Sequence, residues 1–369
     1  MRGAGARMEL AWQSALVPRA MRAKRRGCGA DCGRSVGGGG ARHGARRCAA
    51  RVQAEVRCAA GGGRGDSRRR LKHNAEGALF VDARCIDCDT CRWMAPQTFV
   101  RREGQSSVGH QPTKEHERMA AYRAASACPT GSIRLEPPRT EIQAAELRKA
   151  ADSFPFAFAP DVLPNVFHLG AADRQSFAAC AYLVARLESP AYMVDVPRFS
   201  RALASRVVKA SAGSAPKWMI LTHQDDVGSH ARWAAELEGV TRVMHADDAS
   251  RRAGTTECEL LLRGGGPWEL ADGVEIIAVP GHTRGSIAVL DHRAQALFTG
   301  DHIAYSARAQ GLSCFKAYNW YSWEEQLRSV EKLLDVPFLH ILPGHGRAHH
   351  FQSNEDRRTA LTALLAQVR

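Results

Sequence analysis

The chain has 369 residues and a formal net charge of +13, so it is long enough for about two domains and a single miniature fold is excluded. Residues 1–72 hold 18 Lys and Arg against 4 acids, a net of +14, which leaves 33 bases against 34 acids, or −1, for residues 73–369. Because this larger part is nearly neutral, we expect no nucleic-acid partner. The sequence contains no apolar run of about 18 residues, so we expect no membrane partner either.

Residues 1–72 have the composition of a targeting segment. They contain 14 of the 33 Gly together with many Ala and Arg, and such a segment buries too little apolar surface to fold. An Arg-rich, acid-poor N-terminus favours an organelle transit peptide over a plain basic tail. The pattern VQAEVRCAA at 52–60 is similar to algal chloroplast cleavage regions. We therefore expect the chloroplast stroma, with the mitochondrial matrix as the alternative.

Four cysteines have the spacing of an iron–sulfur site. Three stand two residues apart on one short stretch, and the fourth is followed at once by a proline: Cys85, Cys88, Cys91 and Cys128. Such a tight loop can bind three irons of one 4Fe-4S cluster while the distant Cys-Pro supplies the last ligand. The alternatives are a zinc site, which has no use for three Cys at this spacing, and a disulfide pair.

The segment with CIDCDTC, APQTF and ACPTGSI, within residues 73–137, resembles bacterial-type ferredoxins. In a two-cluster member another Cys-Pro would follow the third cysteine at four residues, but Ala95 stands there before Pro96. The resemblance therefore implies a small ferredoxin-like domain with one 4Fe-4S cluster. Such a cluster passes one electron at a time, so we expect an electron-transfer partner protein.

A second, α+β domain is predicted after a helical linker at 138–154, and it covers residues 155–369. The linker begins after two prolines with Thr140 and Glu141 and ends before Pro155. Beyond it, short apolar runs alternate with helical patterns. Strands are predicted at 166–169, 181–186, 191–194, 218–222, 274–279, 287–291 and 296–299, and helices at 200–210, 230–238 and 323–334.

Histidine and aspartate follow several of these strands. His223 comes after WMILT, His282 after a strand and Pro-Gly, Asp301 after LFTG, and His345 after ILPG. Ligands on loops at strand ends converge easily, and imidazole with carboxylate suits zinc, iron or manganese. One or two divalent metal ions are therefore expected.

The order THxD, PGHTRGS, FTGD and LPGHG, in which successive ligands are 59, 19 and 44 positions apart, resembles the metallo-β-lactamase superfamily. The resemblance covers residues 155–369 and implies an αββα sandwich with a metal centre between two sheets. It also implies that His282 and His345 are ligands, that Asp301 bridges two metals, and that His223 is the first histidine of the signature loop.

The signature loop departs from the family pattern T-H-x-H-x-D-H. Asp225 stands in place of the second His, Val227 in place of the Asp, and Gly228 in place of the final His. Asp226 and His230 are four residues apart, so on a helix starting near Asp226 they would share a face and supply ligands for the second metal. The alternative is that an Asp only caps that helix and His230 faces solvent. We predict Asp225, Asp226 and His230 as metal ligands.

The expected activity is hydrolysis of a small-molecule substrate, similar to that of thioesterases or glyoxalase II, with Asp225 and Asp226 as catalytic carboxylates. An iron-dependent oxidoreductase that receives electrons from the 4Fe-4S cluster is the alternative, because a carboxylate after the first His hardens the ligand set. That version would resemble flavodiiron proteins or persulfide dioxygenases. A third alternative is a degenerate domain that serves only in interactions.

Overall fold

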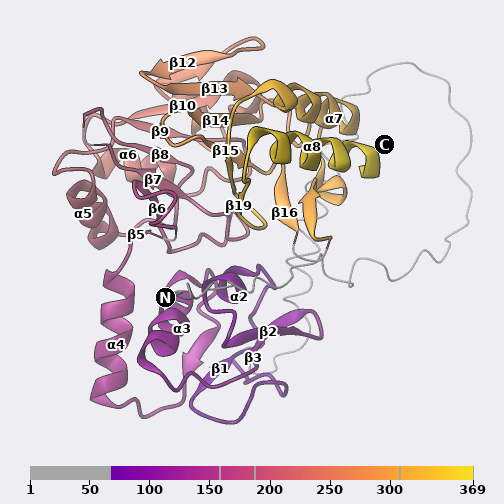
Figure 1. Ribbon diagram of the computed structural model, residues 1–369. Helices are drawn as coiled ribbons and strands as arrows, with labels where there is room; N and C mark the ends of the chain where they lie inside the picture. The colour runs from indigo at the N-terminus through magenta and orange to yellow at the C-terminus, as the bar shows by residue number, and fades with distance from the viewer. Residues whose placement is uncertain (1–67, 158, 187, 307–308, 369) are drawn as a thin grey trace, which may run out of the picture.

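The structure is a computed structural model that describes residues 68–157, 159–186, 188–306 and 309–368. Two sheets form the centre of its larger part, and helices cover their outer faces (Figure 1). The predicted transit segment falls almost wholly outside the described residues. The chain already contacts the ferredoxin segment at Arg70 and Leu71, before the expected start at residue 73, because Arg70 pairs with Glu136 and the Leu71 N–H donates to the Val81 carbonyl.

The first sheet has seven strands with a parallel half and an antiparallel half. The neighbours of β9 pair parallel to it, whereas β5 to β8 form an antiparallel meander. In spatial order the strands are β11 (Leu260–Leu262), β10 (Thr241–His245), β9 (Trp218–Ile220), β8 (Tyr192–Val194), β7 (Tyr182–Val184), β6 (Val166–His168) and β5 (Phe156–Ala157).

The second sheet has six strands, and only its β15–β18 pair is parallel. In spatial order its strands are β12 (Trp268–Ala271), β13 (Val274–Ala278), β14 (Ile287–Asp291), β15 (Ala296–Gly300), β18 (His340–Pro343) and β19 (His349–His350). A hairpin, β16 (Ala304–Ser306) and β17 (Gly311–Ser313), follows β15.

Three apolar clusters define the layers. The middle one joins side chains of both sheets, such as Ile220 of the first sheet and Phe298 of the second. The first sheet packs outward on α5 (Arg201–Ala210) and α6 (His230–Glu236), and the second on α7 (Trp323–Lys332) and α8 (Asn354–Val368). The order helix, sheet, sheet, helix is an αββα sandwich, which confirms the predicted fold class.

The N-terminal region has a separate core. Its strands are β1 (Leu79–Val81) paired with β4 (Ile133–Leu135), and β2 (Phe99–Arg102) paired with β3 (Gln105–Val108). Helices α2 (Thr90–Met94) and α3 (Glu115–Ala127) complete it. The predicted linker contains α4 (Glu141–Asp152), which starts at a Thr140 capping box and packs against this core through Leu147 and Ala150. The linker helix is therefore part of the ferredoxin unit.

Several differences from the sequence expectations have physical causes. Helix α6 begins at His230, where the predicted helix at 230–238 starts, and the earlier start near Asp226 that would have paired Asp226 with His230 does not form, because the chain turns through Gly228 at φ +37° before Ser229. Helix α8 was not expected, since its sequence lacks a clear apolar stripe, yet Leu361, Leu364 and Leu365 are buried. Within the part of the chain that the structure describes, no helix is both long and apolar enough to cross a membrane.

Candidate metal centre and iron–sulfur site

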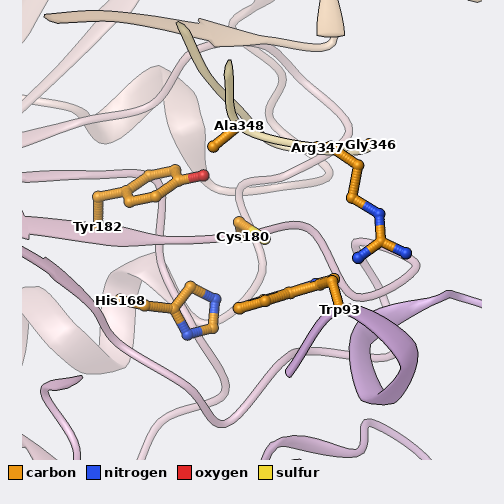
Figure 2. Close-up of a pocket in the computed structure, with 7 residues that line it drawn as sticks. All are labelled: Trp93, His168, Cys180, Tyr182, Gly346, Arg347 and Ala348. Atoms are coloured by element: carbon orange, nitrogen blue, oxygen red, sulfur yellow. The ribbon is translucent and has the colours of Figure 1, made fainter. Parts of the chain in front are cut away.

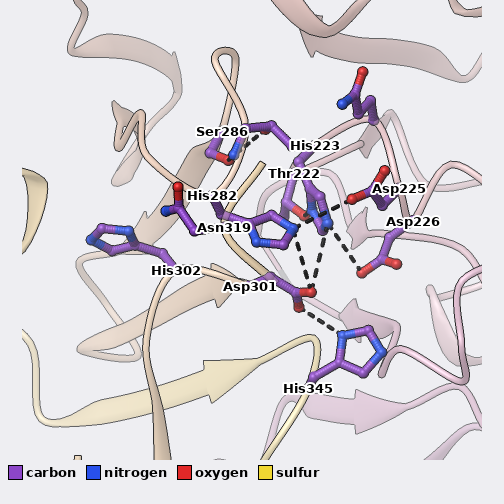
Figure 3. A network of polar contacts seen from close by, with 12 residues as sticks. Thr222, His223, Asp225, Asp226, His282, Ser286, Asp301, His302, Asn319 and His345 are labelled. Atoms are coloured by element: carbon purple, nitrogen blue, oxygen red, sulfur yellow. Dashed lines mark hydrogen bonds and ion pairs between the residues drawn. The ribbon is translucent and has the colours of Figure 1, made fainter. Parts of the chain in front are cut away.

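Four loops at strand ends bring the predicted metal ligands of the second domain together. His223 follows β9 of the first sheet, whereas His282, Asp301 and His345 follow β13, β15 and β18 of the second. Figure 3 shows their side chains pointing toward one another. Gly344, beside His345, is required by this crowding, because a Cβ there would lie 3.0 Å from Asp301 Oδ1.

The ligand atoms form two groups that share one carboxylate. His223, His282 and Asp301 form the first group, and Asp226, Asp301 and His345 form the second. Asp301 Oδ2 lies 3.8 Å from His223 Nε2 and 3.7 Å from His282 Nε2, while Asp301 Oδ1 lies 2.7 Å from His345 Nδ1. A carboxylate whose two oxygens face two different groups is suited to bridging two ions.

Unsatisfied buried atoms show that this cluster fits a metal. Among the residues that the structure describes, the Nε2 atoms of His223, His282 and His345 and Oδ2 of Asp226 are buried without a hydrogen-bond partner. Leaving such groups unpaired costs about 1–3 kcal/mol each. Imidazole nitrogens and carboxylate oxygens that converge in this way are a ligand set for zinc, iron or manganese. The donor set therefore fits one or two divalent ions.

A hydrogen-bonded chain orients His223. Asp195 accepts hydrogen bonds from the Thr222 N–H at 2.8 Å and from the Thr222 hydroxyl at 2.9 Å. Because the Thr222 hydroxyl donates its proton to Asp195, its oxygen accepts a hydrogen bond from Nδ1–H of His223 at 2.9 Å. This tautomer leaves the lone pair of Nε2 directed at the cluster, as a metal ligand requires. Burial also lowers the pKa of His223, which favours the neutral ring.

A second buried carboxylate ties two ligand loops together. Asp248 accepts hydrogen bonds from the Gln224 N–H at 3.0 Å, the Gly285 N–H at 2.7 Å and the Thr283 hydroxyl at 2.5 Å. It thereby holds the loop of His223 against the loop of His282. Sequence reasoning missed Asp195 and Asp248, because each acts through tertiary contacts that no local motif marks.

The electrostatics of the second group depend on Asp301. Burial alone would lower the pKa of His345, but the charge of Asp301 and its hydrogen bond raise it to about 10. Burial also opposes ionisation of Asp301, yet His345, His223 and His282 hold its pKa well below the ordinary value. For Asp226, burial and the nearby charge of Asp301 raise the pKa well above its ordinary range. A bound cation would stabilise the ionised form of Asp226.

Asp225 and Asp226 occupy different positions. Asp226 is 1% exposed and points into the cluster, with Oδ2 3.8 Å from His223 Nε2. The side chain of Asp225 is 42% exposed, and its Oδ2 lies 3.4 Å from His282 Nε2 at the rim of the first group. Burial raises the pKa of Asp225, but the contact with His282 and the charge of His223 lower it by more, so that the net pKa of Asp225 lies below its ordinary value.

His230 lies outside both metal-ligand groups, although the sequence predicted it as a ligand. Its Nε2 is 2.9 Å from the Ala253 carbonyl and its Nδ1 is 3.3 Å from Arg242 Nη1. The expected pairing with Asp226 on one helical face does not form, because Asp226 precedes the helix. His302, beside Asp301, contacts Gln326 at 2.9 Å and belongs to the support of the loop.

The four predicted cluster cysteines lie close together in the N-terminal region. Backbone N–H groups donate to their sulfurs, from Ser106 to Cys85 and from Ser132 to Cys128, both at 3.4 Å. Burial raises the pKa of Cys88 to about 12, and the neighbouring Cys128 and Cys85 raise it as well. Thiols that lie close together, with Cys91 buried, the other three partly buried and two of them accepting N–H···S contacts, fit a 4Fe-4S cluster, which would hold them as thiolates.

The two sites adjoin each other across the domain boundary. Arg347, two residues after His345, forms an ion pair with Asp89, one residue after Cys88, at 2.8 Å. The ring of Trp93 meets the edge of His168 with centroids 4.9 Å apart. The loop that binds the cluster therefore packs on the loop that carries a metal ligand.

Comparisons with known proteins agree with this division of the chain. Residues 81–135 match the family described as the 4Fe-4S single cluster domain of Ferredoxin I. Among the curated proteins, none matches this chain.

Several solved structures resemble part of this chain. A metallo-β-lactamase family protein, TTHA1429 of Thermus thermophilus, is 19% identical, with a TM-score of 0.39 over 56% of this chain and 79% of its own. TTHA1623 in a di-iron-bound form is 22% identical, with a TM-score of 0.37 over 47% and 90%. A metallo-β-lactamase from Hirschia baltica is 16% identical, with a TM-score of 0.36 over 50% and 85%.

The αββα architecture itself rests on the strand order and the three apolar clusters. The ligand groups lie where loops from both sheets meet, as the resemblance to the metallo-β-lactamase superfamily implies. The chain thus joins a single-cluster 4Fe-4S ferredoxin segment to an αββα domain with a candidate metal centre.

Proposed function

We propose that the protein is a metal-dependent hydrolase that attacks an electrophilic carbonyl with water. The observation that carries this proposal is the half-exposed carboxylate of Asp225, 3.4 Å from His282 at the rim of a cluster with unsatisfied ligand atoms. A metal ion bound there would lower the pKa of a coordinated water and stabilise an oxyanion. Asp225 is placed to accept a proton from water, whereas the buried Asp226 serves as a ligand.

Aromatic side chains beside the ligands support an acyl substrate. The ring of Trp320 lies 6.4 Å from that of His282, and the ring of Phe177 lies 6.3 Å from that of His345. Phe177 is 39% exposed, although most large apolar side chains in the described chain are buried. Aromatic rings beside both ligand groups are suited to contact an apolar group next to a carbonyl. A thioester or a hydroxyacyl ester has this chemistry.

Hydrolysis of a panel of acyl thioesters by the metal-loaded protein tests the proposal. Asp225→Asn should lower kcat by about 10²–10⁴-fold, the range for loss of a general base, while the metal content stays near the wild-type value. Asp247→Asn is the matched control, because its side chain is 43% exposed against 42% for Asp225, and it should leave kcat unchanged. Absence of hydrolysis with every ester and every divalent metal would contradict the proposal.

A second candidate is an iron-dependent oxidoreductase, favoured by the contact between the cluster loop and the loop of His345. Three of the converging side chains are carboxylates, Asp225, Asp226 and Asp301, which makes the ligand set hard and favourable to iron. Metal analysis of anaerobically purified protein separates the two candidates. Zinc in the second domain supports hydrolysis, whereas about two irons beyond those of the cluster support the oxidoreductase.

A further inference from the structure

Arg347 connects the two ligand loops through a buried ion pair. Its Nη2 lies 2.8 Å from Asp89 Oδ2, and the two side chains are only 3% and 8% exposed. Asp89 stands between Cys88 and Cys91, and Arg347 stands two residues after His345. A buried ion pair adds little net stability over apolar packing, so its presence here calls for a role beyond stability.

The ion pair belongs to a charged network around the cysteines. Arg92 contacts Asp89 at 2.6 Å and Asp87 at 2.8 Å, and Arg101 contacts Asp87 at 2.6 Å. With Arg347 this makes three cations for two carboxylates. The excess positive charge lies beside four thiols that become thiolates when a cluster is bound, and charge near such a cluster sets its reduction potential.

On the other side, the loop of Arg347 is fixed against the metal centre. The Gly344 N–H donates to the Gly300 carbonyl at 2.8 Å, and the Gly344 carbonyl accepts from the Cys180 N–H at 2.7 Å. Arg347 and Tyr305 exchange backbone hydrogen bonds at 3.1 and 3.2 Å. A loop fixed at this many points moves as a unit, so a displacement of His345 reaches Arg347.

The cysteine loops meet the second domain at two further places. Trp93, two residues after Cys91, packs on His168, and the Ala127 carbonyl, just before Cys128, accepts from the Ala172 N–H at 3.1 Å. Figure 2 shows Trp93, His168 and Arg347 around the small cavity between the domains. The cluster-binding face is therefore turned toward the metal domain of its own chain.

We infer that Arg347 couples the two sites, so that a metal ion bound at His345 raises the reduction potential of the cluster. Filling the metal centre adds positive charge and fixes the loop, and the Arg347–Asp89 contact passes both effects to the cysteine loop. Coupling between two sites is reciprocal, so reduction of the cluster tightens metal binding by the same free energy. This inference does not depend on the proposed hydrolysis, since neither readout below uses an ester.

The test uses the full chain with its cluster and with zinc, which is redox-inert, as the probe. Titration with dithionite, followed by electron paramagnetic resonance, gives the potential of the one-electron reduction with and without zinc. The wild type should show an upward shift with zinc and a correspondingly tighter zinc Kd in the reduced protein. Arg347→Gln should lose at least half of both effects, and Arg347→Lys should fall between, because it keeps the charge without the planar fork.

Arg101→Gln is the matched control, because it removes one cation from the same network without touching the second domain. This variant should have a lower reduction potential of the 4Fe-4S cluster in the absence of zinc, and zinc should still raise that potential by the full wild-type amount. Asp89→Asn removes the carboxylate of the ion pair and should show the same loss of both effects as Arg347→Gln. It therefore serves as the second test if the Arg347→Gln variant assembles no 4Fe-4S cluster. A wild type without a zinc-dependent shift, or a full shift in both Arg347→Gln and Asp89→Asn, would overturn the inference.

Discussion

The two sites of this chain are built in opposite ways. The cysteine site takes three of its four ligands from one stretch of seven residues, Cys85–Cys91, whereas the metal centre takes one ligand or pair from each of four strand-end loops. A local site tolerates little change, since each ligand position is fixed by its neighbours. In a dispersed site, a side chain at a nearby position of a loop can reach the same group, and Asp226 lies in the second candidate group with Asp301 and His345.

The strongest test of this comparison is a substitution in the local site. Cys128→Ser should abolish the 4Fe-4S cluster, because a cubane needs all four thiolates and the cysteine loop offers no replacement. Iron content and the visible absorption of the protein measure this. The second domain, which has its own apolar clusters, should lose no more metal affinity than the roughly 10–100-fold typical of changes that leave the ligands themselves in place.

Cys314→Ser provides the control, because this thiol belongs to the second domain and packs against the apolar side chains around α7 and α8. The 4Fe-4S content of this variant should equal that of the wild type. Retention of a full cluster in Cys128→Ser would disprove the ligand set.

The dispersed site should depend most on the carboxylate that both ligand groups share. Asp301→Asn removes the charge that faces His223, His282 and His345, so zinc affinity should fall by more than the roughly 100-fold typical of changes in the groups that only orient a ligand. Competition with a chromogenic chelator measures the affinity. Asp272→Asn is the control, because this exposed aspartate pairs with Arg293 and belongs to neither ligand group, and it should have no effect. Equal affinities for both variants would mean that the metal is held elsewhere.

A smaller effect is expected from the hydrogen bonds that orient His223. Thr222→Val keeps the shape of the side chain but removes the hydroxyl between Asp195 and His223. Metal affinity should drop by about 10–100-fold, because an unoriented imidazole binds less well. Thr256→Val, in the short 3-10 helix Thr255–Glu257, where the hydroxyl contacts Glu257, is the control for the same chemical change. An unchanged affinity in Thr222→Val would show that the tautomer is fixed by other contacts.

The smallest effect concerns pH in the metal-free protein. The pKa of His345, raised to about 10 by Asp301 against burial, lies above its ordinary value of 6.5. Its stabilisation of the fold is therefore complete below pH 6.5 and lost as the pH rises toward 10. The lowered pKa of Asp301 works in the opposite direction, with stabilisation that is lost as the solution becomes acidic. Denaturant unfolding at a series of pH values, with chelator present, measures both limbs.

His345→Gln should remove the alkaline decline and leave the protein less stable at neutral pH. Bound zinc should also suppress the decline, because the metal replaces the proton on the ring. A metal-free wild type whose free energy of unfolding stays constant between pH 6.5 and 10 would contradict the ion pair.

The sequence predicts the layers and most of the candidate ligands because both follow from short patterns. His282, Asp301 and His345 each follow an apolar strand and stand beside a glycine, and the cysteines have a diagnostic spacing. His230 was predicted as a ligand on the assumption that the helix predicted at 230–238 could extend back to Asp226, but the turn at Gly228 separates Asp226 from that helix.

Contacts between distant parts of the chain could not be predicted. Asp248 binds a loop more than 20 residues upstream and another more than 30 residues downstream, and Arg347 meets Asp89 across the domain boundary. Each of these residues looks like an ordinary surface charge in the sequence. Their burial follows only from the packing of the two sheets and of the ferredoxin segment against them.

Anomalous X-ray diffraction from crystals of the full chain, grown without oxygen, tests the central claim most directly. The account predicts one iron peak enclosed by the four cysteines and a separate metal peak on each side of Asp301, one near His223 and His282 and one near Asp226 and His345. Data at the iron and zinc absorption edges would also identify the ions. A map with no anomalous peak within bonding distance of Asp301 would contradict the candidate metal centre.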